Sequence, residues 1–294
     1  MIVFTISIAI YSWYYFISKP VLKPQLVFSR VDKFGIKEIY PTTPNGREWF
    51  INMQNPLKDS LFSITNNLPI KKNNQDSSWV INGTNIRMNV NTPKGFPQWK
   101  NIEMTGYVKV TSISNETILS NSTDNDNNDN NSKVNNNTIV DIDWRARGGE
   151  HTNKAPCEGT ALNGGIYIDG TVAWKKEIWF TGGYTKEKSI PRITEPLLNR
   201  WIGWKVIVYN INNDSAVKME SYLDNSDSNY WVKVFEITDD GGWFANSSDK
   251  IFYSANCGRS KDHIVLNSGP IVTFRADNIV LNFKDFSIRE IYVH

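Results

Sequence analysis

Residues 140–184 have the sequence VDIDWRARGGEHTNKAPCEGTALNGGIYIDGTVAWKKEIWFTGGY, and this stretch decides the fold class. In residues 140–147 the even positions are apolar and the odd positions are charged, which is typical of a strand with one buried face. Residues 172–180 form a second such strand, whose polar side carries Lys175, Glu177 and Trp179. Two strands of this kind predict a sheet with an apolar back and an ionic front that can hold a polar ligand.

The remainder of the chain repeats short alternating runs and contains almost no helical periodicity. These runs cover residues 99–110, 201–211, 217–224, 231–237, 271–275 and 283–293. Within residues 79–90, the Asn82-Gly83 pair between two apolar runs predicts a hairpin turn. A chain of 294 residues has room for one large sandwich. We therefore predict an all-β fold, an antiparallel β-sandwich that occupies residues 21–294 as a single domain.

Composition limits the classes of partner and marks one loop. The chain has 32 basic and 30 acidic residues, a formal net charge of +2. Nucleic-acid binding requires a concentrated basic field, so nucleic acid is excluded as a partner.

Residues 112–137 are rich in Asn, Asp and Ser and poor in apolar side chains. Such a segment cannot offset the entropy of ordering, so it predicts a disordered loop within the domain.

The first 20 residues are mostly apolar and carry no charge before Lys19. The run is short for a membrane span and lacks a basic start, so a signal-anchor and a signal peptide both stay open. Lys19 and Lys23 favour a cytoplasmic body by the positive-inside rule, whereas two cysteines and the Asn-x-Ser/Thr sequons favour export. We expect an extracellular or cell-surface glycoprotein, either secreted or anchored in the membrane through residues 1–20. The sequons begin at Asn82, Asn115, Asn121, Asn130, Asn136, Asn213 and Asn246.

Cys157 and Cys257 are the two cysteines of the chain. In an exported protein a disulfide between them is favoured over two buried free thiols. Two cysteines are too few for a zinc site without histidine ligands, and His151, His263 and His294 show no ligand spacing. We expect a disulfide between the two cysteines and no zinc site.

The order of several segments resembles the concanavalin A-like lectin and glucanase superfamily. The segments are WRARGG, GGIYIDG, WKVIVYN, KMESYLD and the closing GPIVTFRADN with FKDFSIREI, and the resemblance covers roughly residues 30–294. It implies a jelly roll that binds or cleaves polysaccharides on a concave sheet. It also implies a structural calcium near Asp277, while no cofactor is required.

The charged run WRARGGEH, residues 144–151, is loosely similar to the Arg/Glu strand of alginate-lyase-like polysaccharide lyases. Two other lyase patterns, a Gln-x-His strand and a C-terminal Tyr-x-Lys-x-Gly-x-Tyr strand, are absent from the sequence, as is the Glu-x-Asp-x-x-Glu strand of the glucanases. Whether the protein is an enzyme therefore stays open. The enzymatic alternatives are a polysaccharide lyase and a glycoside hydrolase that uses Glu177 and Glu220 as its two carboxylates.

A lyase acting on uronate-containing chains requires a cation at the carboxylate and a base for the proton. Arg147 and Lys175 are the candidate neutralising groups, and His151 or Tyr209 is the candidate base. The alternative for the charged groups is an ordinary cross-strand ion pair. The candidate catalytic set is Arg147, His151, Lys175, Glu177 and Tyr209.

The predicted binding surface is the ionic front, extended over neighbouring strands. If the alternation holds, residues 140–147, 172–180, 201–211 and 217–224 place four cations and two carboxylates on one side of a sheet. A positive surface with aromatic side chains favours an anionic polysaccharide as the partner. The non-catalytic alternative is a cell-envelope or adhesion module. The candidate ligand-binding set is Arg145, Tyr167, Trp179, Lys205, Glu220 and Tyr222.

Overall fold

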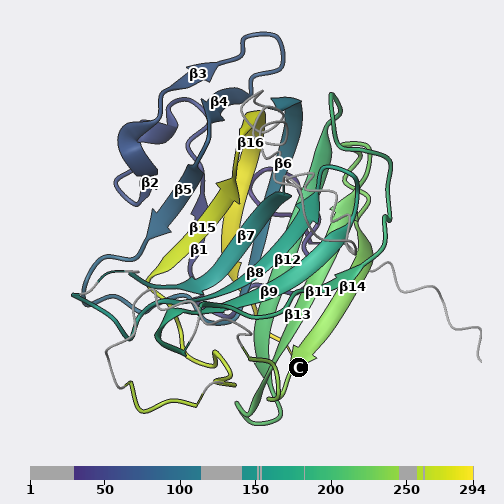
Figure 1. Cartoon of the computed structure of the whole chain (residues 1–294). Helices are drawn as coiled ribbons and strands as arrows, with labels where there is room; N and C mark the ends of the chain where they lie inside the picture. Colours follow the sequence, from purple (N-terminus) through teal and green to yellow (C-terminus); the bar gives the residue numbers. More distant parts are fainter. Residues whose placement is uncertain are drawn as a thin grey trace, which may run out of the picture. The chain divides into compact units, whose positions relative to one another are not determined.

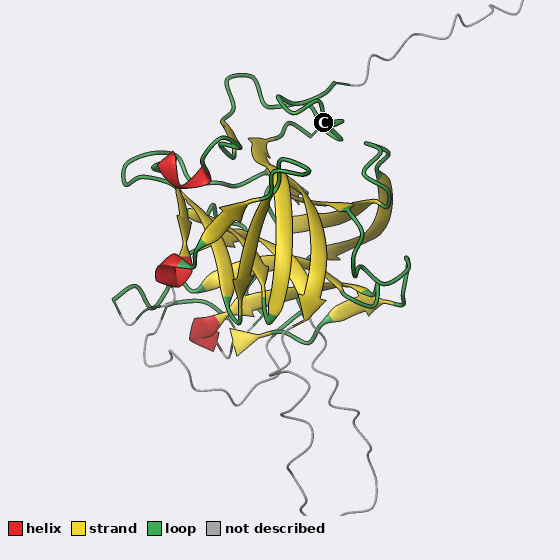
Figure 2. Ribbon diagram, turned by 90° about the horizontal axis from the view of Figure 1, so that it is seen from above, coloured by secondary structure: helices red, strands yellow, loops and turns green. Residues whose placement is uncertain are grey.

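Strands account for nearly all of the regular structure. A computed structural model describes residues 30–113, 141–150, 152, 154–181, 183–244, 257–260 and 262–293. Within these residues, two antiparallel sheets of eight strands each form a sandwich (Figure 1, Figure 2), which confirms the predicted all-β fold class. The helical elements of the same residues are single 3-10 turns, namely η1 (Pro56–Lys58), η2 (Thr65–Asn67) and η3 (Trp179–Thr181).

The first sheet, which we call the β6 sheet, contains strands from both ends of the chain. Its order is β14 (Val232–Asp239), β13 (Ala216–Asp224), β12 (Ile202–Ile211), β6 (Ile102–Ile113), β16 (Ile279–Glu290), β4 (Trp79–Gly83) and β3 (Ile70–Lys72), and β1 (Glu48–Phe50) also pairs with β16. The second sheet, the β7 sheet, faces it. Its order is β10 (Gly183–Tyr184), β9 (Val172–Ile178), β8 (Thr160–Tyr167), β7 (Asp141–Gly148), β15 (Ile271–Ala276), β5 (Ile86–Asn91) and β2 (Phe62–Ile64), and β11 (Lys188–Ile190) also pairs with β9.

Early and late strands are neighbours in both layers, which closes the sandwich as a jelly roll. The late strand β16 lies between β6 and β4, and β15 lies between β7 and β5. The predicted hairpin in residues 79–90 is wrong, because β4 and β5 belong to different sheets. The chain crosses from one layer to the other just after the Asn-Gly pair, so that Ile81 and Ile86 both enter the core from opposite sheets.

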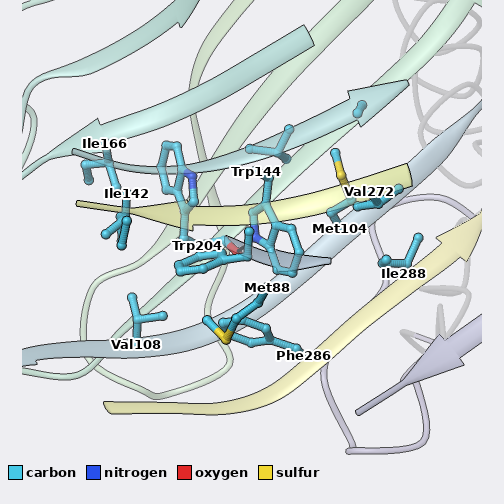
Figure 3. Packing of buried hydrophobic residues seen from close by; sticks show 14 of the residues in the cluster. Met88, Met104, Val108, Ile142, Trp144, Ile166, Trp204, Val272, Phe286 and Ile288 are labelled. Atoms are coloured by element: carbon cyan, nitrogen blue, oxygen red, sulfur yellow. Dashed lines mark hydrogen bonds between the residues drawn. The ribbon is translucent and has the colours of Figure 1, made fainter. Parts of the chain in front are cut away.

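The core between the sheets consists of the apolar sides of the alternating strands. Trp144, Trp174 and Trp204 are fully buried in it. Figure 3 shows Trp144 of the β7 sheet next to Trp204 of the β6 sheet, and the indole of Trp144 donates to the Trp204 carbonyl over 3.4 Å. Gly164 has to be a glycine, because a Cβ at this position would lie 2.8 Å from the Trp174 ring. Truncating one of these tryptophans to alanine would cost about 3–5 kcal/mol, so they anchor the two layers.

Residues 31–40 cover the outer face of the β6 sheet. Ile36 packs there in a second apolar cluster, and Lys205 Nζ donates to the Lys37 carbonyl over 2.6 Å. Beneath this segment the Glu103 carboxylate pairs with Lys205 at 2.7 Å and with Arg289 at 2.8 Å, and all three side chains are buried. The part of this outer face around β6, β12 and β13 is therefore closed by the chain itself.

The predicted disulfide is confirmed. Cys157 and Cys257 are bonded, with their Cα atoms 5.5 Å apart, across a separation of 100 positions. The bond fastens residues 257–260 to the loop that precedes β8.

Several predictions concern residues outside the described ones. The predicted signal segment, residues 1–20, lies outside them, as do residues 114–140, which include most of the predicted Asn-rich loop. The first two residues assigned to that loop, Ser112 and Ile113, belong to β6. Of the sequons, those at Asn82 and Asn213 fall within the described part. Across that part, no helix combines the length and the apolar character that a membrane span requires.

Candidate functional site

The outer face of the β7 sheet carries the ionic front that the sequence predicts. Arg145 of β7, Asn163 of β8 and Lys175 of β9 stand side by side in the pairing register. Glu177 follows two positions after Lys175 and points to the same side, because the apolar neighbours Trp174 and Ile178 are in the core. The prediction that Arg145, Lys175 and Glu177 share a face is confirmed.

Glu177 is the centre of a group of linked polar side chains. Its Oε1 accepts hydrogen bonds from Arg145 Nη1 and, over 2.8 Å, from Asn163 Nδ2, and its Oε2 accepts one from Trp179 Nε1 over 3.0 Å. Arg145 Nε also donates to Asp143 Oδ1 over 3.0 Å. Burial alone would lower the pKa of Arg145, but the carboxylates of Asp143 and Glu177 outweigh it and raise the pKa, so the guanidinium stays charged. We call these five residues, Asp143, Arg145, Asn163, Glu177 and Trp179, the Glu177 cluster.

The Glu177 cluster contains polar atoms that have no hydrogen-bond partner. These atoms are Asp143 Oδ2, Arg145 Nη2 and Asn163 Oδ1, and all three are buried. A buried polar atom without a partner costs about 1–3 kcal/mol, so such atoms are few in native proteins. Three of them in one linked group are typical of a place that a water or a ligand group occupies.

Two aromatic rings border the Glu177 cluster. Tyr184 of β10 stands opposite Glu177 in the register, and its ring meets the Trp179 ring edge-on with centroids 5.4 Å apart. Both side chains are half-buried, and Lys175 Nζ lies 6.0 Å from the Tyr184 ring centre. Burial raises the pKa of Tyr184, and the Glu177 carboxylate adds to the shift, so its hydroxyl is neutral at physiological pH.

Cations and carboxylates balance on this face, and the predicted excess of positive charge is wrong. Lys175 Nζ pairs with Asp141 Oδ2 at 3.1 Å, and Asp277 pairs with Arg87 at 2.6 Å and with Arg275 at 2.5 Å. The prediction fails because Lys205 and Glu220 belong to the other sheet and Arg147 turns inward. The cations of β5, β7, β9 and β15 on this face are Arg87, Arg145, Lys175 and Arg275, and the carboxylates are Asp141, Asp143, Glu177 and, directly after β15, Asp277.

Arg147 leaves the ionic front, contrary to the prediction that it continues it. The pairing of β7 with β15 shifts between Arg145 and Gly148, which is a bulge, and Arg147 has a φ of 56°. A bulge changes the side on which the next residue points, so the alternation ends here. The Arg147 guanidinium is buried at the end of the sandwich, where it donates to the carbonyls of Lys100 and Val265.

The predicted partners from β12 and β13 lie on the opposite side of the molecule. Lys205, Tyr209, Glu220 and Tyr222 point to the outer face of the β6 sheet, and residues 31–40 cover them. Two packed sheets are about 10 Å apart, so these side chains cannot share a ligand with the Glu177 cluster. The single surface predicted from strand alternation is therefore wrong, because alternation assigns a side chain to a face but not to a sheet.

Among the described residues, neither catalytic set of the sequence prediction is complete. Glu177 and Glu220 belong to different sheets and cannot flank one glycosidic bond. Tyr209 lies beneath Tyr40, and burial together with the Tyr40 hydroxyl raises its pKa, which makes it a poor base. His151 lies outside the described residues.

The remaining candidates have ordinary structural partners. Tyr167 donates to Glu187 Oε2 over 2.5 Å at the rim of the same sheet. The oxygens of Asp277 accept from two arginines, an unfavourable setting for a cation, and the described residues contain no group of three or more His, Cys, Asp or Glu side chains that could hold a metal. The predicted calcium stays a prediction.

Two residues of the site carry little signal in the sequence. Asn163 stands in a Leu-Asn-Gly-Gly run, which is typical of a turn, although here it is in the middle of β8. Tyr184 ends a short Gly-Gly-Tyr segment after the end of the alternating run. Both reach the site through pairing with β9, which the local sequence does not specify.

His263 lies near this sheet, and its lowered pKa predicts that the protein loses stability in mild acid. Burial lowers the pKa of His263 to about 4, with Arg259 and Lys176 adding to the shift. Between pH 6.5 and 4 the unfolded chain binds a proton on His263 that the folded chain does not, so stability falls as the pH falls through this window. After discounting for the partial exposure of the ring, we expect a loss of about 1 kcal/mol between pH 7 and pH 5.

Urea denaturation at the two pH values measures this loss, and His263→Gln is the matched variant. The variant should lose less stability than the wild type between pH 7 and pH 5. An equal loss in both proteins would assign the effect to other groups.

Comparisons with known proteins find solved structures of low similarity and no related sequence. No model of a known protein family matches the chain, and no curated protein sequence matches it. Among solved structures it is similar to a protein of unknown function with a galectin-like fold from Bacillus subtilis (TM-score 0.46, 11% identity, covering 87% of this chain and 100% of the other). It is also similar to peanut lectin (TM-score 0.39, 8% identity, covering 85% and 100%).

A third similar structure is the binding domain of botulinum neurotoxin serotype D, with a TM-score of 0.37 and 12% identity over 79% of this chain. The chain spans 44% of the length of that domain. The predicted similarity to alginate-lyase-like enzymes receives no support from these comparisons. At these identities and TM-scores, neither family nor function follows from the likeness.

Proposed function

We propose that the protein is a carbohydrate-binding module whose site is the Glu177 cluster. The observation that carries the proposal is the set of unpartnered polar atoms on Asp143, Arg145 and Asn163, next to the half-buried rings of Trp179 and Tyr184. Sugar hydroxyl groups both donate and accept hydrogen bonds, so they can satisfy two acceptors and one donor together. The apolar face of the same sugar ring can pack against an aromatic ring.

A sugar reaches these atoms only if a covering side chain moves, because the atoms have no exposed surface. Tyr184 is the side chain that we expect to move. It belongs to β10, a strand of two residues that pairs only with the end of β9. A short edge strand has few backbone hydrogen bonds, and such segments open at low free energy.

The balance of charge around the Glu177 cluster favours an uncharged saccharide over the acidic polysaccharide of the sequence prediction. Along β5, β7, β9 and β15, with Asp277 directly after β15, four cations face four carboxylates, and each is paired within the protein. A charged ligand would have to break one of these pairs. The proposal does not include catalysis, since Tyr209 and Glu220 belong to the other sheet and Arg147 turns away from Lys175 and Glu177. The disulfide supports a location in an oxidising compartment or outside the cell.

A panel of neutral and acidic oligosaccharides, followed by calorimetric titration of the tightest binder, tests the proposal. Trp179→Ala should weaken binding about tenfold, since an aromatic contact of this kind contributes about 0.5–1.5 kcal/mol beyond the area it buries. Trp201→Ala is the matched control, because Trp201 is also half-buried but packs on the β6 sheet next to Lys284.

The proposal predicts that neutral oligosaccharides bind at least as tightly as acidic ones and that added salt has little effect. It is abandoned if no saccharide on the panel binds. It is equally abandoned if Trp179→Ala and Trp201→Ala bind the titrated saccharide as tightly as the wild type does.

A further inference from the structure

A cavity of about 480 Å³ lies at one end of the sandwich and shares no residue with the Glu177 cluster. The loop after β7, the loop before β8 and the segment before β15 line it, and it is open to solvent on one side. Its volume is within the range of small-molecule sites, about 300–1,000 Å³. The residues on which the argument below rests are Lys100, Arg147, Gly149, Glu158, Arg259 and Gly269.

The wall of this cavity is closely packed. Gly149 has no room for a Cβ because the Glu158 carbonyl lies against it, and Gly269 has none because the Arg147 backbone does. Backbone segments that approach this closely hold each other in place, so the cavity is formed without a ligand. The Cys157–Cys257 disulfide fastens a third segment, with Arg259, to the same rim.

Arg147 contributes a buried positive charge to the wall. Its guanidinium donates to the Lys100 carbonyl over 3.0 Å, to the Val265 carbonyl over 2.6 Å and to Asn101 Oδ1 over 3.3 Å, which are all neutral acceptors. Within the described parts of the chain, no carboxylate forms an ion pair with it. Burial lowers the pKa of Arg147 to about 9 against the smaller opposing effect of the Asp214 carboxylate, so Arg147 is still charged at neutral pH. A buried charge without a counter-ion is costly, and an anion in the cavity would offset that cost.

The rim adds to this positive field. Lys100 and Arg259 are on the rim, and Glu158 is the carboxylate among the described lining residues. Asp214, just outside the lining, pairs with Lys100 at 3.0 Å, so three cations face two carboxylates and one net positive charge remains at the cavity. A concave site with one sign of charge attracts ligands of the opposite sign.

We propose that this cavity is a second binding site, for a small polar molecule that carries a carboxylate. Arg259 binds the carboxylate directly at the rim, Lys100 does so by exchanging its solvent-exposed pair with Asp214, and the buried Arg147 supports the carboxylate through the field of its charge. Neutral polar side chains of the lining, among them Gln98 and Asn267, contact the rest of the ligand. The site goes beyond the proposed function, because it uses a different part of the fold and a different ligand charge.

The first test compares D-glucuronate with D-glucose, which has the same ring without the carboxylate. Titrations followed by amide NMR should give saturable binding of glucuronate and binding of glucose that is at least tenfold weaker. The shift changes should fall on the amides of Gly148, Gly149 and Gly269. Binding of glucuronate should weaken as salt is added, because the rim charges are exposed.

Two charge variants with opposite expected effects make the test sharper. Lys100→Gln should weaken glucuronate binding about five- to tenfold, whereas Glu158→Gln should strengthen it about two- to fivefold. Both side chains are on the surface, so neither change threatens the fold. Lys71→Gln on the distant strand β3 is the matched control and should change nothing, and Trp179→Ala should leave glucuronate binding unchanged as well.

Equal binding of glucuronate and glucose would overturn the second site. So would a change of glucuronate affinity in the same direction in Lys100→Gln and in Glu158→Gln. If glucuronate instead perturbs Gly165 and Gly183 beside the Glu177 cluster, the cavity proposal fails while the proposed carbohydrate site stands. If glucuronate binds in the cavity and Trp179→Ala weakens the binding of no saccharide, the cavity proposal stands and the proposed carbohydrate site fails.

Discussion

Replacing Lys176 by methionine should lower the free energy of unfolding by about 3–5 kcal/mol. Lys176 Nζ lies in the interior, 2.7 Å from Asp239 Oδ2 and 2.8 Å from the His263 carbonyl, and neither charged side chain has any exposed surface. The ammonium group is also 5.3 Å from the Trp243 ring centre. Methionine would fill a similar volume but leave the Asp239 carboxylate buried without a counter-ion. Urea denaturation measures the loss.

A second substitution should recover most of this loss. Replacing both partners of a buried ion pair with apolar side chains is often neutral or stabilising, so Lys176→Met with Asp239→Leu should be much more stable than Lys176→Met alone. Lys175→Met is the matched control, because Lys175 is the sequence neighbour on the outer face, where its pair with Asp141 is partly exposed. It should cost about 1 kcal/mol or less. If the two single variants lose the same stability, the buried position of Lys176 is refuted.

Removing the disulfide should have an effect of similar size. The bond between Cys157 and Cys257 closes a loop of about 100 residues, for which the loss of chain entropy in the unfolded state corresponds to about 4.7 kcal/mol. The double variant Cys157→Ser with Cys257→Ser should therefore have a markedly lower midpoint of urea denaturation. Serine is close to cysteine in size, so the change tests the cross-link more than the packing.

Each single serine variant should lose as much stability as the double variant, because either one removes the bond. Reduction of the wild-type protein should reproduce the loss without any substitution. A loss below about 1 kcal/mol in the double variant would show that the unfolded chain gains little freedom when the bond is absent.

The alternation of residues 140–147 and 172–180 is sufficient to predict the β7 sheet and its polar face. Arg145, Lys175 and Glu177 come together as predicted, because a period of two fixes the face of each side chain once the strand is formed. The same alternation places Lys176 on the apolar side, between Trp174 and Ile178. Its partner Asp239 comes from β14 in the other sheet, and no local pattern connects the two.

At the candidate sites, two features of the tertiary structure give an arrangement that strand alternation does not predict. A bulge turns Arg147 away from the ionic front, and its cause is the pairing with β15, more than 120 positions later in the chain. Glu177 is separated from Glu220 because β7 and β9 belong to one sheet and β12 and β13 to the other. Strand order depends on which long-range pairings close the sandwich, and each of these pairings is a choice among many strands with the same alternation.

The sequence by itself determined the fold class, the face of most strand residues and the disulfide, since each follows from local periodicity or from having only two cysteines. The tertiary structure alone decided which charged residues are neighbours. It placed Asn163 and Tyr184 beside Glu177, covered the β6 sheet with residues 31–40, and left Arg147 buried at a cavity without a carboxylate partner among the described residues. The physical reason is that side-chain direction is a local property of the backbone, whereas the pairing of charges depends on contacts between segments that are far apart in the chain.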